Sequence, residues 1–372
     1  MLDAWGSSPD PCAKCDRASN SSCFAGPHKV FAPSALRVGN LLAGKFRIEK
    51  LIGNGGMGLV FAAHHVHLDQ RVAIKVLRPR ALKHQEAIRC FLGEAQAAAK
   101  LDSQHIVRVL DANAFECGLT FLVMEYLEGN DLSQWVANKG TLPVAQVVDF
   151  VLQACEALAL AHTAGIVHRD VKPSNLFCCE RPDGSQCIKV IDFGISIIQP
   201  LAADYCALGS HANPVMGSPH YMSPEQLKSP ATVDARADIW SLGVTLFELL
   251  TGHLPFDGNT LPELEATIAG QPTPAIGSYR VDVPPTLQEV VGRCLRKDAQ
   301  LRYASIAELA NALQPFAQER VHAQVDSVHP APFRKPTSLW RHIHAAGRIL
   351  VRNVFARRPS GMATAQTKVA GV

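Results

Sequence analysis

Short apolar runs dominate the stretch between residues 46 and 125. Apolar and polar residues partly alternate over 46–52, and two further runs, 72–77 and 121–124, are apolar apart from one lysine and rich in β-branched side chains. Such runs predict strands, whereas the apolar positions within 85–101 recur at helical spacing. We therefore expect a small β-rich unit that contains one helix.

The next stretch, 126–316, has the longer apolar periods of helices. Residues 144–163 are apolar on all sides, as in a buried helix, and 239–250 form a second long run. Proline and glycine are frequent over 270–285, which predicts a loop, and helical spacing returns over 286–315. The two stretches together predict an α+β fold with two lobes, the first β-rich and the second larger and mainly helical.

Both ends of the chain differ from these lobes. Residues 1–40 are rich in Ser, Pro, Ala and Cys and lack periodicity, which predicts a flexible extension. Residues 317–372 are rich in Pro, His and Arg, and within them 338–358 have the pattern of a basic amphipathic helix. Two interpretations of that helix stay open: it lies on an anionic membrane or in a partner groove, or it packs on the larger lobe.

Composition excludes several classes of protein. Apolar residues make up 47% and charged residues 19% of the 372 residues, which is enough for a large core. The net charge of +3 does not indicate nucleic-acid binding. No run of about 18 uncharged apolar residues predicts a membrane-spanning helix, and the first residues lack the pattern of a signal peptide. We expect a cytoplasmic protein.

The cysteine content supports the same location. The eleven cysteines are odd in number and irregular in spacing, which favours reduced thiols over a disulfide scaffold. Four potential zinc ligands occur near the start, at Cys12, Cys15, Cys23 and His28. Only the first two have the spacing of a zinc site, so free cysteines and a zinc knuckle both stay open.

A glycine-rich segment follows the first predicted strand. The pattern G-x-G-x-x-G-x-V is matched by Gly53, Asn54, Gly55, Gly56, Met57, Gly58, Leu59 and Val60. Glycines without a Cβ let backbone amides approach phosphate oxygens, although a plain hairpin turn explains the pattern equally well. The segment leads into a strand, whereas the dinucleotide-binding fingerprint leads into a helix.

Lys75 lies 17 residues after Gly58, at the end of Val-Ala-Ile-Lys within a predicted strand. One interpretation is an edge-strand lysine that discourages aggregation. The other is a cation directed at the α- and β-phosphates of a nucleotide, which Glu94 on the following helix holds in place through an ion pair.

A second motif combines five fixed positions within eight residues. The pattern H-R-D-x-K-x-x-N is matched by His168, Arg169, Asp170, Val171, Lys172, Pro173, Ser174 and Asn175. In phosphoryl transfer Asp170 can accept the proton of the attacking hydroxyl, and Lys172 can balance the charge of the γ-phosphate. Asn175 and Asp192, the latter in Asp-Phe-Gly after an apolar run, supply the oxygen ligands that Mg²⁺ prefers.

Together these residues resemble the signature set of the eukaryotic-like serine/threonine protein kinases of bacteria. The resemblance extends over about 46–316 and includes the run Tyr221-Met222-Ser223-Pro224-Glu225-Gln226. It implies a bilobal kinase fold that binds ATP and Mg²⁺ and phosphorylates serine or threonine of partner proteins in signalling. It also implies an adenine pocket that comprises Val60, Ala73, Met124, Glu125, Leu127 and Phe177, with Asp131 at the ribose.

The same resemblance implies four further features. Glu225 pairs with Arg302, and Asp238 bonds the backbone of the catalytic loop. Serine replaces the usual threonine at Ser218; it keeps the hydroxyl, so we expect activity, and the substrate preference stays open. Arg169 before the catalytic aspartate suggests a loop that is switched by phosphorylation, with autophosphorylation at Ser210 as one interpretation and a passive polar loop as the other.

Two alternatives to an active kinase remain. One is a kinase-fold scaffold with weak or no catalysis, and the other is an adaptor tethered to a membrane through its tail. The presence of Lys75, Glu94, Asp170, Asn175 and Asp192 disfavours the scaffold. The sequence does not indicate an oligomeric state or a physiological substrate.

Overall fold

The computed structural model of the chain describes residues 36–55, 58–78, 85–114, 120–193, 219–229 and 233–317. Several predictions concern other residues. The possible zinc ligands of the N-terminal extension, the tail helix over 338–358, Ser210 and Ser218 lie outside the described residues.

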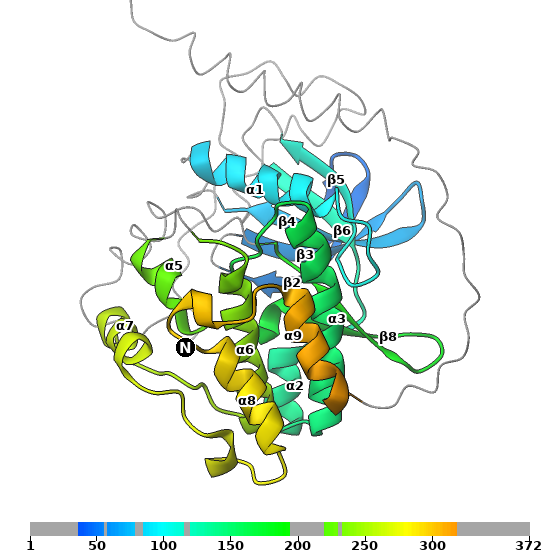
Figure 1. Ribbon diagram of the computed structural model, residues 1–372. Coiled ribbons are helices and arrows are strands. Elements are labelled where there is room, and N and C mark those ends of the chain that lie inside the picture. The colour runs from blue at the N-terminus through cyan, green and yellow to red at the C-terminus, as the bar shows by residue number, and fades with distance from the viewer. Residues whose placement is uncertain are drawn as a thin grey trace, which may run out of the picture.

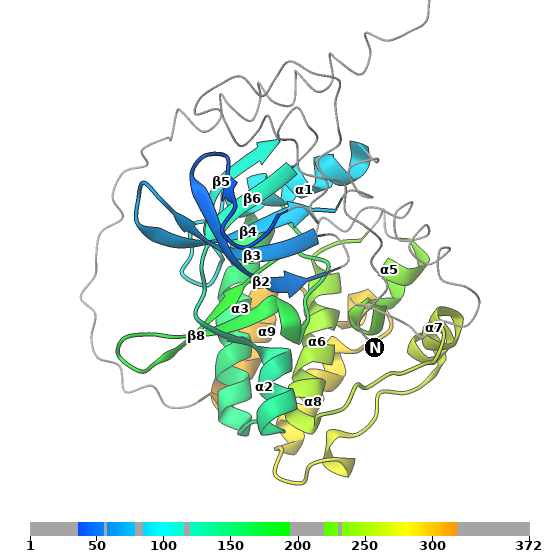
Figure 2. The ribbon, with the colours of Figure 1, turned by 180° about the vertical axis from the view of Figure 1, so that it is seen from behind.

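The smaller lobe is built on a six-stranded antiparallel sheet with the order β1-β2-β3-β4-β6-β5. Its strands are β1 (Leu41–Leu42), β2 (Phe46–Asn54), β3 (Gly58–His65), β4 (Gln70–Leu77), β5 (Val109–Ala114) and β6 (Thr120–Glu125). Helix α1 (Gln85–Ala98) lies on one face of the sheet (Figures 1 and 2). The strands and the helix expected from the apolar pattern are confirmed, with α1 ending three residues earlier than the pattern indicated.

Alternation along β2 explains how this lobe is filled. Phe46 and Ile48 are buried, whereas Arg47 between them is exposed, so one face of the strand contacts the core. Leu36 packs into the same cluster, together with Phe61, Ile74 and Phe121. Residues that precede the first expected strand therefore contribute to the core of this lobe.

The larger lobe is mainly helical and lies below the sheet in Figure 1. Its α-helices are α2 (Leu132–Lys139), α3 (Val144–Thr163), α5 (Pro224–Lys228), α6 (Arg236–Thr251), α7 (Leu261–Gly270), α8 (Pro285–Cys294) and α9 (Ile306–Leu313). Short 3₁₀ turns join them, among them η3 (Pro173–Asn175) in the catalytic motif. The helices expected at 144–163 and 239–250 correspond to α3 and to most of α6.

Helix α3 packs against several elements of the larger lobe. It contacts α6, α9 and β9 (Gln186–Val190), and half of its residues are buried. Among the described residues it is the one helix long and apolar enough to cross a bilayer, yet 56% of its apolar window is buried in the protein. A core helix accounts for this composition.

A small sheet lies between the lobes, with the order β7-β8-β9. Strands β7 (Gly129–Asp131) and β8 (Leu176–Glu180) precede β9, and the hairpin of β8 and β9 projects from the side of the larger lobe (Figures 1 and 2). Val190 on β9 accepts a hydrogen bond from Val107 and donates one to His105, which ties this sheet to the segment before β5. The hairpin thereby connects Asn175, at its start, with Asp192, at its end.

Candidate active site

Lys75 lies on a central strand of the sheet. Its strand β4 pairs with β3 on one side and with β6 on the other, so the interpretation of an edge-strand lysine is wrong. The residue is 6% exposed, and its Nζ donates to Asp192 Oδ1 at 2.8 Å. A cation this deeply buried requires an anionic partner. The contact joins the two lobes at the end of β9.

Asp192 adopts a backbone conformation that is rare outside glycine, with φ of 54°. Burial alone raises the pKa of its carboxyl, but the charge of Lys75 and the hydrogen bond from it outweigh burial, and the pKa lies below its ordinary value. Lys172 and His168 act in the same direction. The side chain is therefore an anion. It is also 39% exposed, so part of the carboxylate is accessible.

Asp170, Lys172 and Asn175 form a bonded cluster in the catalytic motif. Lys172 Nζ donates to Asp170 Oδ2 at 2.7 Å, and Asn175 Nδ2 donates to the same oxygen at 3.0 Å and to the backbone oxygen of Asp170 at 2.8 Å. These bonds fix the orientation of the Asn175 amide, because its nitrogen donates both of them and its oxygen is directed elsewhere. Ile191 N donates to Asn175 O at 3.0 Å, which connects the cluster to the residue before Asp192.

The backbone of the catalytic motif is held from two sides. Asp238 at the start of α6 accepts hydrogen bonds from His168 N (2.9 Å) and Arg169 N (2.7 Å), which confirms the expected role of this aspartate. On the other side Gln226 Nε2 donates to Arg169 O at 2.9 Å. Arg169 has φ of 67°, a strained conformation for a long side chain that costs about 1–3 kcal/mol. The surrounding bonds hold that strain in place.

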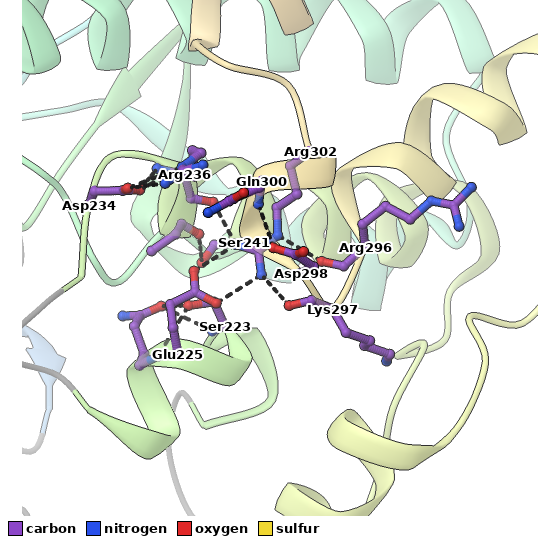
Figure 3. A network of polar contacts seen from close by, with 12 residues as sticks. Ser223, Glu225, Asp234, Arg236, Ser241, Arg296, Lys297, Asp298, Gln300 and Arg302 are labelled. Atoms are coloured by element: carbon purple, nitrogen blue, oxygen red, sulfur yellow. Dashed lines mark hydrogen bonds and ion pairs between the residues drawn. The ribbon is translucent and has the colours of Figure 1, made fainter.

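Glu225 and Arg302 form the expected ion pair. Two parallel bonds of 2.6 and 2.8 Å join the guanidinium to the carboxylate, and the same guanidinium donates to the backbone oxygens of Arg236, Arg296 and Lys297 (Figure 3). The Arg302 side chain is fully buried. This pair fixes α5, which carries Gln226, against the loop before α9.

The residues expected around the adenine lie in two groups, one in the first lobe and one in the small sheet. Ala73 on β4 lies opposite Met124 on β6, and both are buried in one cluster. Val60 and Leu127 are partly buried and pack against this cluster. Phe177 lies opposite Asp131 in the small sheet. Their role in nucleotide binding stays a prediction.

Two expected binding residues have structural contacts of their own. Asp131 caps helix α2, where its Oδ1 accepts a hydrogen bond from Gln134 N at 3.0 Å. Glu125 Oε1 accepts bonds from Lys189 Nζ at 2.8 Å and from Arg108 N at 2.7 Å. The second set ties the segment between the lobes to β9.

The glycine-rich segment is the hairpin between β2 and β3. Gly53 and Asn54 end β2, and Gly58 begins β3. A Cβ on Gly58 would lie 2.5 Å from Val76 O, so only glycine fits there. Arg78 Nε donates to Gly55 O at 3.1 Å and Arg78 also bonds the side chain of Asn54. Gly56, Met57 and the side chain of Glu94 lie outside what the structure describes, although Glu94 is on α1.

Sequence reasoning missed three residues of this site. They are Gln226, Lys189 and His162, for which the sequence predicts no contact. His162 Nε2 forms a hydrogen bond with Asp238 Oδ2 at 2.7 Å. The spacing of Ser223 and Gln226 is that of a capping box, which the structure contains, but nothing local indicates the bond from Gln226 to Arg169. All three contacts join residues far apart in the chain.

Comparisons with known proteins agree with this geometry. The protein kinase domain family matches residues 46–318. The kinase Pkn1 of Myxococcus xanthus is 38% identical over 77% of this chain and 40% of its own length, and PrkC of Bacillus subtilis is 36% identical over 77% and 42%. The chain thus spans less than half the length of these two relatives.

Solved structures give the same result. The kinase domain of PknI from Mycobacterium tuberculosis superposes with a TM-score of 0.59 and 31% identity over 76% of this chain and all of that domain. Rad53, solved with AMP-PNP, gives a TM-score of 0.56 and 25% identity over 73% of this chain and 65% of that chain. The chain belongs to the protein kinase family, in its bacterial eukaryotic-like serine/threonine branch.

Proposed function

We propose that this chain transfers the γ-phosphoryl group of ATP to serine or threonine hydroxyls of proteins in bacterial signalling, in the cytoplasm. The observation that carries the proposal is the bonded set of Asp170, Lys172, Asn175, Asp192 and Lys75, in which two cations, two carboxylates and one amide converge from both lobes. Phosphoryl transfer requires this combination of positioning and charge.

The donor set suits Mg²⁺ and a nucleotide. An amide oxygen of Asn175 and the anionic, part-exposed carboxylate of Asp192 are the hard oxygen ligands that Mg²⁺ takes alongside phosphate and water. Gly58 keeps the hairpin backbone free of side-chain atoms where Val76 O approaches it. Bound Mg²⁺ neutralises the charge that develops on the phosphates. Lys75 adds a cation on the same side, next to Asp192.

Asp170 receives the proton in this scheme. The hydroxyl oxygen of the substrate attacks the γ-phosphorus, the bond from that phosphorus to the β–γ bridging oxygen breaks, and ADP leaves. Lys172 and Asn175 both bond Oδ2 of Asp170, which orients the carboxylate so that its other oxygen can accept the hydroxyl proton. Lys172 supplies a positive charge where the transferred group carries negative charge.

A substitution at Asp170 tests the proposal. The purified chain is incubated with magnesium and radiolabelled ATP and with a generic protein substrate, alongside Asp170→Asn and, as a matched control, the exposed Asp102→Asn. We expect a loss of label transfer of about 10²–10⁴-fold for Asp170→Asn and none for the control. A folded wild-type protein that binds the nucleotide but transfers no label to itself or to any acceptor would instead be a scaffold.

A further inference from the structure

Two cysteines lie directly opposite each other in the hairpin of β8 and β9. Cys179 pairs with Cys187, and both are free thiols. At the two ends of this ladder, Arg181 N donates to Ser185 O and Ile191 N donates to Asn175 O, so both of these end pairs are hydrogen-bonded pairs. Hydrogen-bonded and non-hydrogen-bonded pairs alternate along an antiparallel ladder, and Cys179 with Cys187 is therefore also a hydrogen-bonded pair. The Cα atoms of such a pair are about 5.5 Å apart, within the range of about 4.4–6.8 Å that a disulfide spans.

Neighbouring cysteines do not share this arrangement. Residues that face each other across a ladder put their side chains on the same face of the sheet, whereas adjacent residues alternate. Cys178 is therefore on the other face, where it belongs to the core of the larger lobe. Cys155 and Cys294 are buried in that core as well.

The surroundings of the two thiols differ. Cys187 Sγ accepts a hydrogen bond from Arg181 Nη2 at 3.2 Å. It also lies 3.8 Å from His105 Nδ1, which donates its proton to Ile188 O at 2.8 Å. A permanent cation and an N–H group therefore border Cys187 Sγ, which is buried. Burial raises the pKa of the half-buried Cys179 to about 11, against the opposing charge of Lys189.

We propose that Cys179 and Cys187 are a modification site that forms a reversible intramolecular disulfide in the presence of a hydroperoxide. Cys187 Sγ attacks the O–O bond, the alcohol or water leaves, and Cys187 becomes a sulfenic acid. The Cys179 sulfur then displaces the sulfenic hydroxyl as water and forms the S–S bond. In sum, two thiols and one hydroperoxide give one disulfide, one alcohol or water, and one water. A dithiol reductant reverses the reaction.

This disulfide lies next to the contact between β9 and the segment that joins the lobes. Lys189, on the same face as Cys187 and two residues away, pairs with Glu125 at 2.8 Å, and Phe177 lies two residues before Cys179. Oxidation draws Cys187 Sγ away from Arg181 and His105 and shifts β9. Resting on the proposed function, we expect the oxidised protein to bind magnesium ATP about fivefold more weakly than the reduced protein.

Peptide mapping tests the disulfide independently of kinase activity. Lys172 and Arg181 both precede proline, so trypsin releases all three hairpin cysteines in one peptide, residues 170–189. A second protease that cleaves after Glu180 separates Cys178 and Cys179 from Cys187. After treatment of the full chain with hydrogen peroxide and alkylation of the remaining thiols, we expect the two fragments to stay joined until a reductant is added.

Single cysteine variants identify which sulfur atoms form the disulfide. Cys178→Ser and the buried control Cys155→Ser should keep the joined fragments. Cys179→Ser should lose them and leave a sulfenic acid on Cys187 that dimedone labels. Separate fragments from folded, peroxide-treated wild type, or a bond between Cys178 and Cys179, would overturn the proposal. Equal affinity of the oxidised and reduced proteins for magnesium ATP, measured by calorimetry, would overturn the proposed coupling to the nucleotide site.

Discussion

Two ion pairs, Lys75 with Asp192 and Glu225 with Arg302, join distant parts of this chain and differ in how far solvent reaches them. Arg302 has a fully buried side chain, binds its carboxylate through two parallel bonds and donates to three backbone oxygens. Lys75 gives Asp192 one contact of 2.8 Å, and 39% of the Asp192 side chain is exposed. The first pair is closed to solvent, whereas the second has room for another ligand.

This difference separates stability from chemistry. A closed bidentate pair with its remaining donors satisfied holds elements together, and its removal strands buried groups. An open pair keeps a carboxylate charged and accessible, as a metal ligand must be. We therefore expect substitutions in the two pairs to affect different measurements.

The largest effect is expected for Lys75→Met. Loss of this cation should lower kcat/KM by about a thousandfold, because charge stabilisation in the transition state is lost. The melting temperature should change little, since the replacement is apolar, of similar length and lies among apolar neighbours. The exposed Lys50→Met on β2 is the matched control. A melting temperature that falls together with activity would contradict the separation.

Arg302→Met should mainly affect stability. We expect the free energy of unfolding to fall by about 3 kcal/mol, because Glu225 and three backbone oxygens lose buried donors. The control is Arg293→Met, which breaks an exposed pair with Glu308 and should cost at most about 1 kcal/mol. Urea unfolding followed by circular dichroism measures both. Equal losses in the two variants would show that the closed geometry of the Arg302 pair adds nothing.

The motif residues were predictable from the sequence because each motif is local. Asp170, Lys172 and Asn175 lie within one turn and its flanks, so their spacing alone brings them together. The apolar pattern likewise predicted the main strands and helices. Two other contacts were indicated only by the family resemblance and not by spacing. Asp238 bonds the catalytic motif across 69 residues, and Arg302 bonds Glu225 across 77 residues.

Other features could not be read from the sequence. Whether Lys75 was on an edge or a central strand depended on the order of strands, which periodicity does not determine. The contacts of Gln226 with Arg169 and of Lys189 with Glu125 join side chains to partners 57 and 64 residues away. The pairing of Cys179 with Cys187 depended on the register of a hairpin whose turn carries no unique signal.

Acid should remove the contribution of the Glu225–Arg302 pair to the free energy of unfolding. Burial alone raises the pKa of Glu225, but the bonds and charge of Arg302 outweigh it and hold the pKa below its ordinary value of 4.5. A carboxyl whose pKa is lower in the folded state stabilises the fold above its unfolded pKa and loses that contribution as the pH falls through the folded pKa. The difference in unfolding free energy between wild type and Arg302→Met should therefore shrink as the pH falls from about 7 to below the ordinary pKa of 4.5. A constant difference over this interval would contradict the assignment.

The smallest effect is expected where an ion pair only positions a binding segment. Lys189→Met removes the bond to Glu125, but Arg108 N still holds that carboxylate at 2.7 Å. For a part-exposed pair we expect a loss of about 0.5–1 kcal/mol, seen as a rise of about two- to fivefold in KM for ATP with kcat unchanged. Lys189→Arg keeps the charge and should restore KM. A fall in kcat at constant KM would instead assign Lys189 to the chemical step, alongside the open pair of Lys75 and Asp192 that follows β9.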